Sequence, residues 1–166
     1  MPADRPTAPT ANAPGLLAAL ARHAVRLVVG AVFLYAGAIK IADPAAFAKN
    51  IYHYQMLPDL AVNLMALVLP WLECVAGAAL IIAPRLRRGA AGWIVLMLLM
   101  FTTAIVISIL RGLDISCGCM STSPDAARIG WKKVAENAGL LALSIYAFIQ
   151  AGRHPAVRRT DPKAPA

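Results

Sequence analysis

Charged residues are scarce in this sequence. Only 14% of its 166 residues are Asp, Glu, Lys or Arg, whereas 60% are hydrophobic. A soluble domain carries about 25% charged residues. A single small core cannot bury so much apolar surface. The composition therefore argues against a soluble domain and favours a protein that contacts lipid.

Aromatic residues are also few, at 7%, and they do not interleave with the basic residues. The net charge of +8 therefore lacks the combination of a basic patch and a binding motif that is typical of a nucleic-acid-binding surface. The basic residues form short clusters between apolar runs, as the topology signals of membrane proteins do. We expect the lipid bilayer as a partner and no nucleic acid.

The alternation of apolar and polar residues that marks a barrel strand is absent, which argues against a membrane β-barrel. Backbone groups in lipid are otherwise satisfied within helices. Four apolar runs are present instead, at residues 27–42, 61–83, 90–110 and about 134–151. A helix needs about 20 residues to cross the hydrocarbon core, and the second and third runs meet this length unaided. The sequence predicts an all-α, polytopic bundle of four transmembrane helices.

The bundle is predicted to occupy residues 15–151, with residues 1–14 and 152–166 as disordered tails rich in proline. Residues 15–21 are expected to add an interfacial turn or two to the first helix. A cleaved signal peptide is an alternative for the first run, because residues 36–38 read Ala-Gly-Ala like a cleavage site. The three further spans favour an uncleaved helix.

Lys and Arg are distributed unequally between the two sides of the predicted bundle. Ten lie in the N-terminal segment, the second loop and the C-terminal tail, and six lie on the other side, in the other two loops or, for Lys40, near the far end of the first run. Because cytoplasmic loops are enriched in Lys and Arg, both termini are expected in the cytoplasm. The loop that carries Cys117 and Cys119 is then expected in the periplasm, and the protein in the bacterial inner membrane.

Residues 43–60, between the first two runs, are predicted to include a short helix on the membrane surface. Phe47, Ile51 and Tyr54 are spaced i, i+4, i+7, which places them on one helical face. Aromatic residues favour the depth of the membrane interface, so anchoring is the expected role of this helix.

The predicted periplasmic loop contains a C-x-C pair, Cys117 and Cys119. A disulfide between them closes a small, strained ring, and Gly118 accepts the backbone angles that such a ring needs. Strained, exposed disulfides are oxidising and tend to be catalytic. A bridge between such close neighbours constrains the chain very little, so a structural role explains it poorly.

Basic residues, which stabilise thiolates, flank this loop: Arg111, Lys132 and Lys133. Two alternatives stay open for the pair. Cys117 and Cys119 are inert loop thiols in the first. In the second they form a soft Cu(I) site with Met120, and His53 or Met56 supplies a further ligand. The loop lacks the second pair of ligands that a zinc site needs, and we expect no bound metal.

Glu73 is the only formal charge in the run 61–83 and lies near its middle. A charged group at this depth costs roughly 2.5–3.5 kcal/mol, so Glu73 is a functional candidate. It is expected to face the bundle, protonated or paired, and a purely structural helix–helix hydrogen bond is the alternative. Lys40 is expected to reach the membrane interface rather than pair with Glu73. Cys74 is expected to be a small packing residue, and Pro70 to open its helix.

Five features occur in a characteristic order along the chain. They are the segments GAVFLYAGAIK (residues 30–40), YQMLP (54–58) and LPWLECVAG (69–77), followed by Cys117-Gly118-Cys119 and the fourth apolar run. In this order they resemble the MauE/DoxX family of redox-associated four-helix membrane proteins over about residues 22–150. Family members often continue the C-G-C motif with Phe-Gly, whereas Met120 and Ser121 follow here.

The resemblance implies a role in thiol–disulfide chemistry. The MauE branch is linked to maturation of periplasmic methylamine dehydrogenase through disulfide formation, and DoxX-type relatives are associated with thiosulfate:quinone oxidoreductase. Cys117 and Cys119 are then the redox pair and Glu73 is the family's glutamate. A periplasmic redox or client protein, or a quinone, is the implied redox partner, with no covalently bound cofactor. A quinone-linked electron-transfer subunit and a non-catalytic scaffold of a redox complex are the alternatives.

Overall fold

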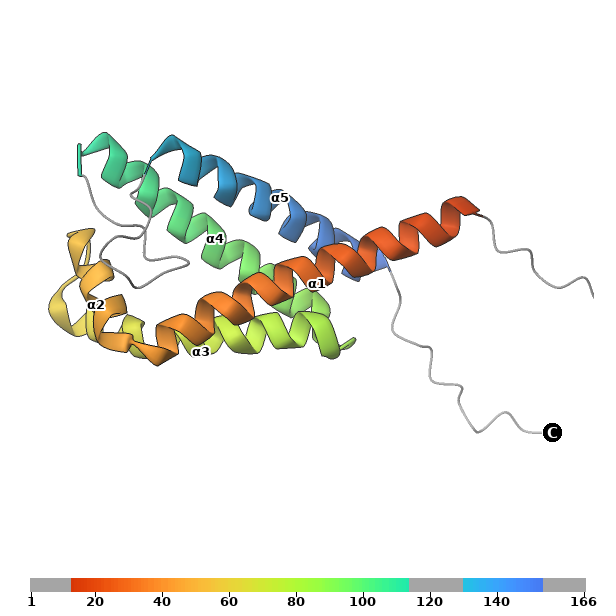
Figure 1. Cartoon of the computed structure of the whole chain (residues 1–166), viewed down its shortest axis with the longest axis horizontal. Helices are drawn as coiled ribbons and strands as arrows, with labels where there is room; N and C mark the ends of the chain where they lie inside the picture. Colours follow the sequence, from red (N-terminus) through yellow and green to blue (C-terminus); the bar gives the residue numbers. More distant parts are fainter. Residues whose placement is uncertain (1–12, 114–129, 154–166) are drawn as a thin grey trace, which may run out of the picture.

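The computed structural model describes residues 13–113 and 130–153, and this part of the chain forms helices and no strand (Figure 1). The helices are α1 (Ala13–Ala42), α2 (Pro44–His53), α3 (Asp59–Ile82), α4 (Arg87–Leu110) and α5 (Trp131–Arg153). All except α2 are long and apolar enough to cross a membrane. The predicted all-α bundle with four spans is confirmed, and the protein has the architecture of a multi-pass membrane protein.

The observed spans begin and end within three residues of the predicted runs, except at the start of the first span. There α1 is one continuous helix from Ala13, so residues 15–21 extend the first helix, and the candidate span begins at Leu16. The segments predicted as tails lie almost entirely outside the described residues, and these domain limits stay predictions.

The four long helices follow one another around the bundle in the order α1, α3, α4, α5. The largest interfaces are those of α1 with α3 and of α4 with α5, and contacts of α3 with α4 and of α1 with α5 close the ring. In Figure 1, α2 lies across one end of the bundle, while the start of α1 and the end of α5 lie towards the other end. Both ends of the described chain therefore lie at the same end of the bundle.

Glycines allow α1 and α3 to approach closely. A Cβ atom at Gly77 of α3 would lie 2.7 Å from the carbonyl oxygen of Gly30 in α1. A Cβ atom at Gly37 would lie 2.7 Å from the carbonyl oxygen of Pro70, so a larger residue would collide with backbone at both places. Small residues are typical of such crossings in membranes, where close packing supplies the attraction between helices.

The short helix α2 begins where Asp43 caps it. The Asp43 carboxylate accepts a hydrogen bond of 2.9 Å from the backbone N–H of Ala46, and Pro44 follows in the first turn, where proline is well suited. A helix was correctly predicted here, but its expected position with the apolar face in the membrane surface is wrong. Phe47 and Ile51 are buried in the protein, because α2 packs against α3 and α1.

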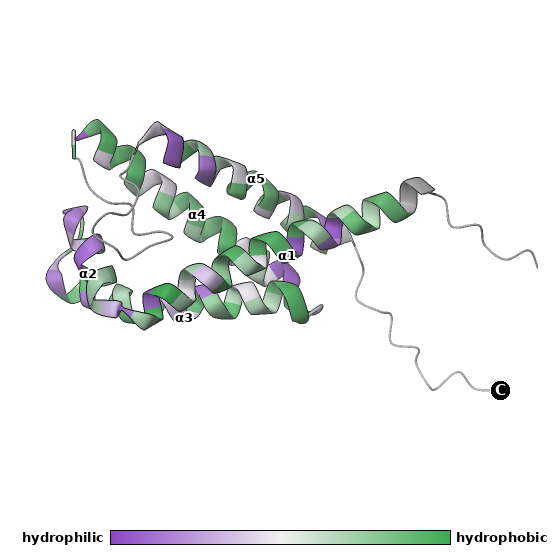
Figure 2. Cartoon of the chain, in the orientation of Figure 1, coloured by the Kyte–Doolittle hydropathy of each residue, from purple (hydrophilic) through white to green (hydrophobic). Residues whose placement is uncertain are grey.

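The outward faces of the long helices are apolar. On α3, the side chains of Leu67, Trp71 and Val75 are 60%, 61% and 63% exposed, and their i, i+4, i+8 spacing makes one stripe along the helix. Figure 2 shows hydrophobic residues along the spans, whereas hydrophilic residues are frequent around α2. Hydration of such a surface is unfavourable, so the exterior fits a lipid environment.

We expect Gly77→Ala to destabilise the bundle, because the added methyl group forces α1 and α3 apart. Overpacking of this kind typically costs about 1–3 kcal/mol. The matched control is Gly139→Ala in α5, where a Cβ atom meets nothing within 4 Å. Alanine has the better helix propensity, so this variant should be at least as stable as the wild type. Thermal unfolding of the detergent-solubilised protein, followed by circular dichroism, measures both. Equal midpoints for the two variants would contradict the close crossing.

Candidate functional site

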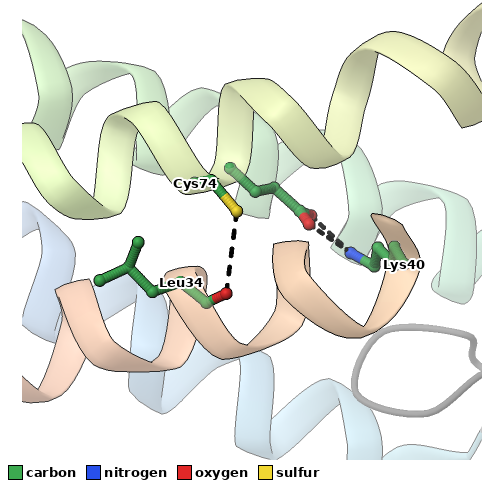
Figure 3. A network of polar contacts seen from close by, with 4 residues as sticks. Leu34, Lys40 and Cys74 are labelled. Carbon is green, nitrogen blue, oxygen red and sulfur yellow. Dashed lines mark hydrogen bonds and ion pairs between the residues drawn. The ribbon is translucent and has the colours of Figure 1, made fainter. Parts of the chain in front are cut away.

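Glu73 lies on the inner face of α3 and is only 2% exposed. The ammonium group of Lys40, from α1, donates hydrogen bonds of 2.5 Å and 2.7 Å to the two carboxylate oxygens of Glu73. Lys40 is itself 1% exposed. Figure 3 shows Lys40 extending from α1 towards the carboxylate on α3. The two opposite charges thus form an ion pair inside the bundle.

The expectation that Lys40 reaches the interface instead of pairing with Glu73 is wrong. Every Cα–Cβ bond in a helix tilts towards the helix N-terminus. Lys40 lies at the end of α1, so this tilt directs its side chain back into the bundle. The antiparallel α3 directs Glu73 the opposite way, and the two side chains therefore converge. The expectation that Glu73 faces the bundle and is paired is confirmed.

The sequence contained a signal for this pair. Gly37 lies three residues before Lys40, and Pro70 lies three residues before Glu73, so each charged residue shares a helix face with a residue of the close crossing. Because Gly37 packs directly on the carbonyl of Pro70, the faces that carry the two charges are opposed. The helix α3 runs through Pro70 without a break.

Two aromatic rings complete the surroundings of Lys40. Its Nζ atom lies 4.9 Å from the ring centroid of Phe47 on α2 and 5.3 Å from that of Phe101 on α4. Cation–π attraction of this kind is strongest where the cation is removed from water. The ammonium group of Lys40 on α1 therefore lies against groups from three further helices, α2, α3 and α4.

Cys74, the neighbour of Glu73, lies against α1. Its Sγ atom is 3.8 Å from the backbone carbonyl oxygen of Leu34, a weak thiol hydrogen bond that Figure 3 also shows. The same sulfur would be 2.5 Å from a Cβ atom at Gly37. Cys74 therefore acts as a small packing residue at the crossing, as the sequence suggested.

The predicted redox residues Cys117 and Cys119 lie in residues 114–129, outside the described residues, as does Met120. Leu113 is the last described residue before this segment, and Gly130 is the first described residue after it. The structure thus positions Glu73 and Lys40, and the redox role of the cysteines stays a prediction. Within residues 13–113 and 130–153, no cluster of three His, Cys, Asp or Glu side chains is arranged to hold a metal ion.

The residues next to that segment hold one end of the bundle together. The Arg111 guanidinium donates hydrogen bonds of 3.2 Å and 3.4 Å to the backbone carbonyls of Tyr54 and Gln55, which ties the end of α4 to the chain after α2. Tyr54 also packs with Ile105 and with Val134 near the start of α5. The ends of α2 and α4 and the start of α5 thus form a packed end of the bundle.

The basic residues expected to flank the cysteines lie at this end of the bundle. They are Arg111, Lys132 and Lys133, and two of them have partners. Arg111 makes the two carbonyl contacts, and Lys133 forms an ion pair of 2.7 Å with Glu136. The carboxylate of Glu136 is about half exposed, so solvent screens this pair and it stabilises the protein little.

Comparison with known proteins gives one consistent family. Residues 16–150 match the family model described as methylamine utilisation protein MauE. Curated relatives carry the same description, and no solved structure matches the chain.

Three relatives illustrate the extent of the similarity. The chain is 32% identical to the protein of Paracoccus denitrificans over 74% of this chain and 65% of the relative. It is 35% identical to that of Paracoccus versutus over 76% and 67%, and 32% identical to that of Methylophilus methylotrophus over 72% and 63%. The matched region thus spans close to two thirds of each relative's own length.

We expect that removing one charge of the ion pair lowers the free energy of unfolding far more than replacing both charges does. Lys40→Met or Glu73→Leu alone leaves one buried charge without its partner, which costs about 3–5 kcal/mol, whereas the double variant removes both charges and recovers most of this loss. Unfolding midpoints and membrane levels of the four proteins provide the double-mutant cycle. Additive effects of the two single changes would show that the charges do not stabilise one another.

Proposed function

Because this chain belongs to the MauE family, we propose that it is an accessory membrane protein of methylamine utilisation that supports thiol–disulfide chemistry at Cys117 and Cys119. The observation that carries the proposal is the position of the C-G-C motif inside the matched residues 16–150. We propose a periplasmic dehydrogenase of this pathway, such as methylamine dehydrogenase, as the client, as the resemblance to the MauE/DoxX family implies.

The proposed reaction is a disulfide exchange followed by reoxidation. A client thiolate attacks the Cys117–Cys119 disulfide, and a second client thiol resolves the mixed disulfide. The client loses two electrons and gains a disulfide, while Cys117 and Cys119 become thiols. Reoxidation requires a two-electron acceptor, for which we propose a membrane quinone that takes up two electrons and two protons to become a quinol.

The bundle supports this reaction by holding both ends of the cysteine-bearing segment. Leu113 and Gly130 follow α4 and precede α5 at the packed end that Arg111, Tyr54 and Val134 form. The ion pair fixes α1, α3 and the two helices whose rings contact Lys40. We therefore propose that Glu73 acts as a positioning residue through Lys40, while its catalytic role stays a prediction.

The proposed location is the bacterial inner membrane, with both termini in the cytoplasm and residues 114–129 facing the periplasm. Ten basic residues on the proposed cytoplasmic side, against five on the other side once the buried Lys40 is left out of the six, support this orientation. An oxidising periplasm would also maintain the disulfide form of the pair.

We expect single replacement of either cysteine, Cys117→Ser or Cys119→Ser, to abolish formation of the active client in cells while leaving the membrane level of the protein unchanged. Residues that act as one redox unit fail together. Labelling with a mass-tagging maleimide should place two more labels on the wild-type loop after mild reduction than before it. Neither serine variant should show this increase. Cys74→Ser is the control and should keep both activity and label shift. Harmless serine variants with free native thiols would instead identify a non-catalytic scaffold.

The orientation has its own test. A reporter enzyme that is active only in the periplasm should be silent when fused after Ala166 and active when inserted near Ser123, because one span separates these two positions. The reverse pattern would remove the oxidising environment on which the proposed chemistry depends.

A further inference from the structure

A second charged feature lies at the end of the bundle away from α2. Arginines are grouped there on α1, on the α3–α4 turn and on the start of α4: Arg22, Arg26, Arg85, Arg87 and Arg88. The carboxylates of the described residues lie elsewhere. Asp43 and Asp59 flank α2 in the sequence, Glu73 pairs with Lys40, and Glu136 pairs with Lys133 near the start of α5. Among the described residues, this arginine end therefore has no countercharge of its own.

Arg26 is the centre of the group. Its charge interacts with that of Arg87 on α4 and with that of Arg22, one turn earlier on α1. All three side chains are partly buried rather than extended into solvent. Like charges held near one another repel, and an anion bound among them would relieve this repulsion.

The start of α4 adds to the positive potential. This helix has no acidic residue in its first turn and no side-chain cap, so the positive end of its dipole is not offset by the chain. The Nε atom of Arg87 is buried and has no hydrogen-bond partner among the described residues, while Nη2 makes only a long contact of 3.4 Å with the Ile81 carbonyl. The chain thus satisfies the hydrogen-bonding capacity of the Arg87 guanidinium only in part.

We propose that Arg22, Arg26 and Arg87 bind the phosphodiester headgroup of an anionic phospholipid at the membrane surface. Guanidinium groups donate paired hydrogen bonds to phosphate oxygens, and basic pockets between transmembrane helices recognise such headgroups. Ile82 and Leu86, beside the cluster, are 75% and 62% exposed. Their apolar surface fits the acyl chains of a lipid, which a free phosphate ion lacks.

The other two arginines serve as comparisons. Arg88 lies 5.4 Å from the ring centroid of Phe148 on α5 and is engaged there. Arg85 is exposed in the turn between α3 and α4. Arg85 therefore contributes to the overall charge of this end without belonging to the headgroup site, which makes it the matched control.

The experiment measures lipid binding to the purified full chain in a neutral detergent. Phosphatidylglycerol and phosphatidylcholine with the same acyl chains, and inorganic phosphate, are each titrated while thermal unfolding is followed and bound lipid is counted by native mass spectrometry. Phosphatidylglycerol should raise the unfolding midpoint of the wild type, and the other two should not. Arg26→Gln should weaken phosphatidylglycerol binding about tenfold, the effect of losing one charge-assisted contact, and Arg85→Gln should bind like the wild type.

A second readout separates a binding role from a structural one. Arg26→Gln relieves repulsion, so in neutral detergent without lipid its midpoint should equal or exceed that of the wild type, even though its response to phosphatidylglycerol falls. Arg22→Gln should behave in the same way. Equal responses to the two lipids, a phosphate effect as large as that of phosphatidylglycerol, or equal losses in Arg85→Gln and Arg26→Gln would each overturn the proposed site.

Discussion

A charge inside a membrane bundle needs a partner that compensates for its lost hydration, and Lys40 and Glu73 each supply one to the other. Their pairing also fixes the relative height of α1 and α3. A shift of one helix by a single turn, about 5.4 Å, would separate the charges and move Gly37 away from the Pro70 carbonyl. Electrostatics and close packing therefore specify the same register.

The two ends of the bundle differ in chemistry. At the end that α2 covers, backbone carbonyls accept hydrogen bonds from Arg111, and the helix ends pack on one another around Tyr54. At the opposite end, arginines converge without a described carboxylate among them. The first end is completed by the protein itself, whereas the second depends on the surrounding lipid. The ion pair lies between the two and joins the helices that carry them.

The sequence was sufficient to predict the spans because continuous apolar runs depend on composition alone, and a run such as residues 90–110 carries no charge over a length that crosses the hydrocarbon core. It also predicted that Glu73 faces inward, because an isolated carboxyl group in lipid is too costly. The partner of Glu73 was missed, since the sequence does not show which residues of the two helices lie opposite one another, and only the packed structure sets Gly37 against Pro70. The burial of α2 was missed for a related reason: an apolar face at Phe47 and Ile51 fits lipid and protein equally well, and only the packed structure distinguishes the two.

The separation of the ion-paired residues in the sequence has a consequence for biosynthesis. Lys40 is made 33 residues before Glu73, so at about 5–20 residues per second α1 exists for about 2–7 s before its partner carboxylate has been translated. A lone ammonium group is costly in hydrocarbon, so we expect Lys40 to stay at the membrane surface during this interval. The first helix would then reach its final depth only when α3 arrives.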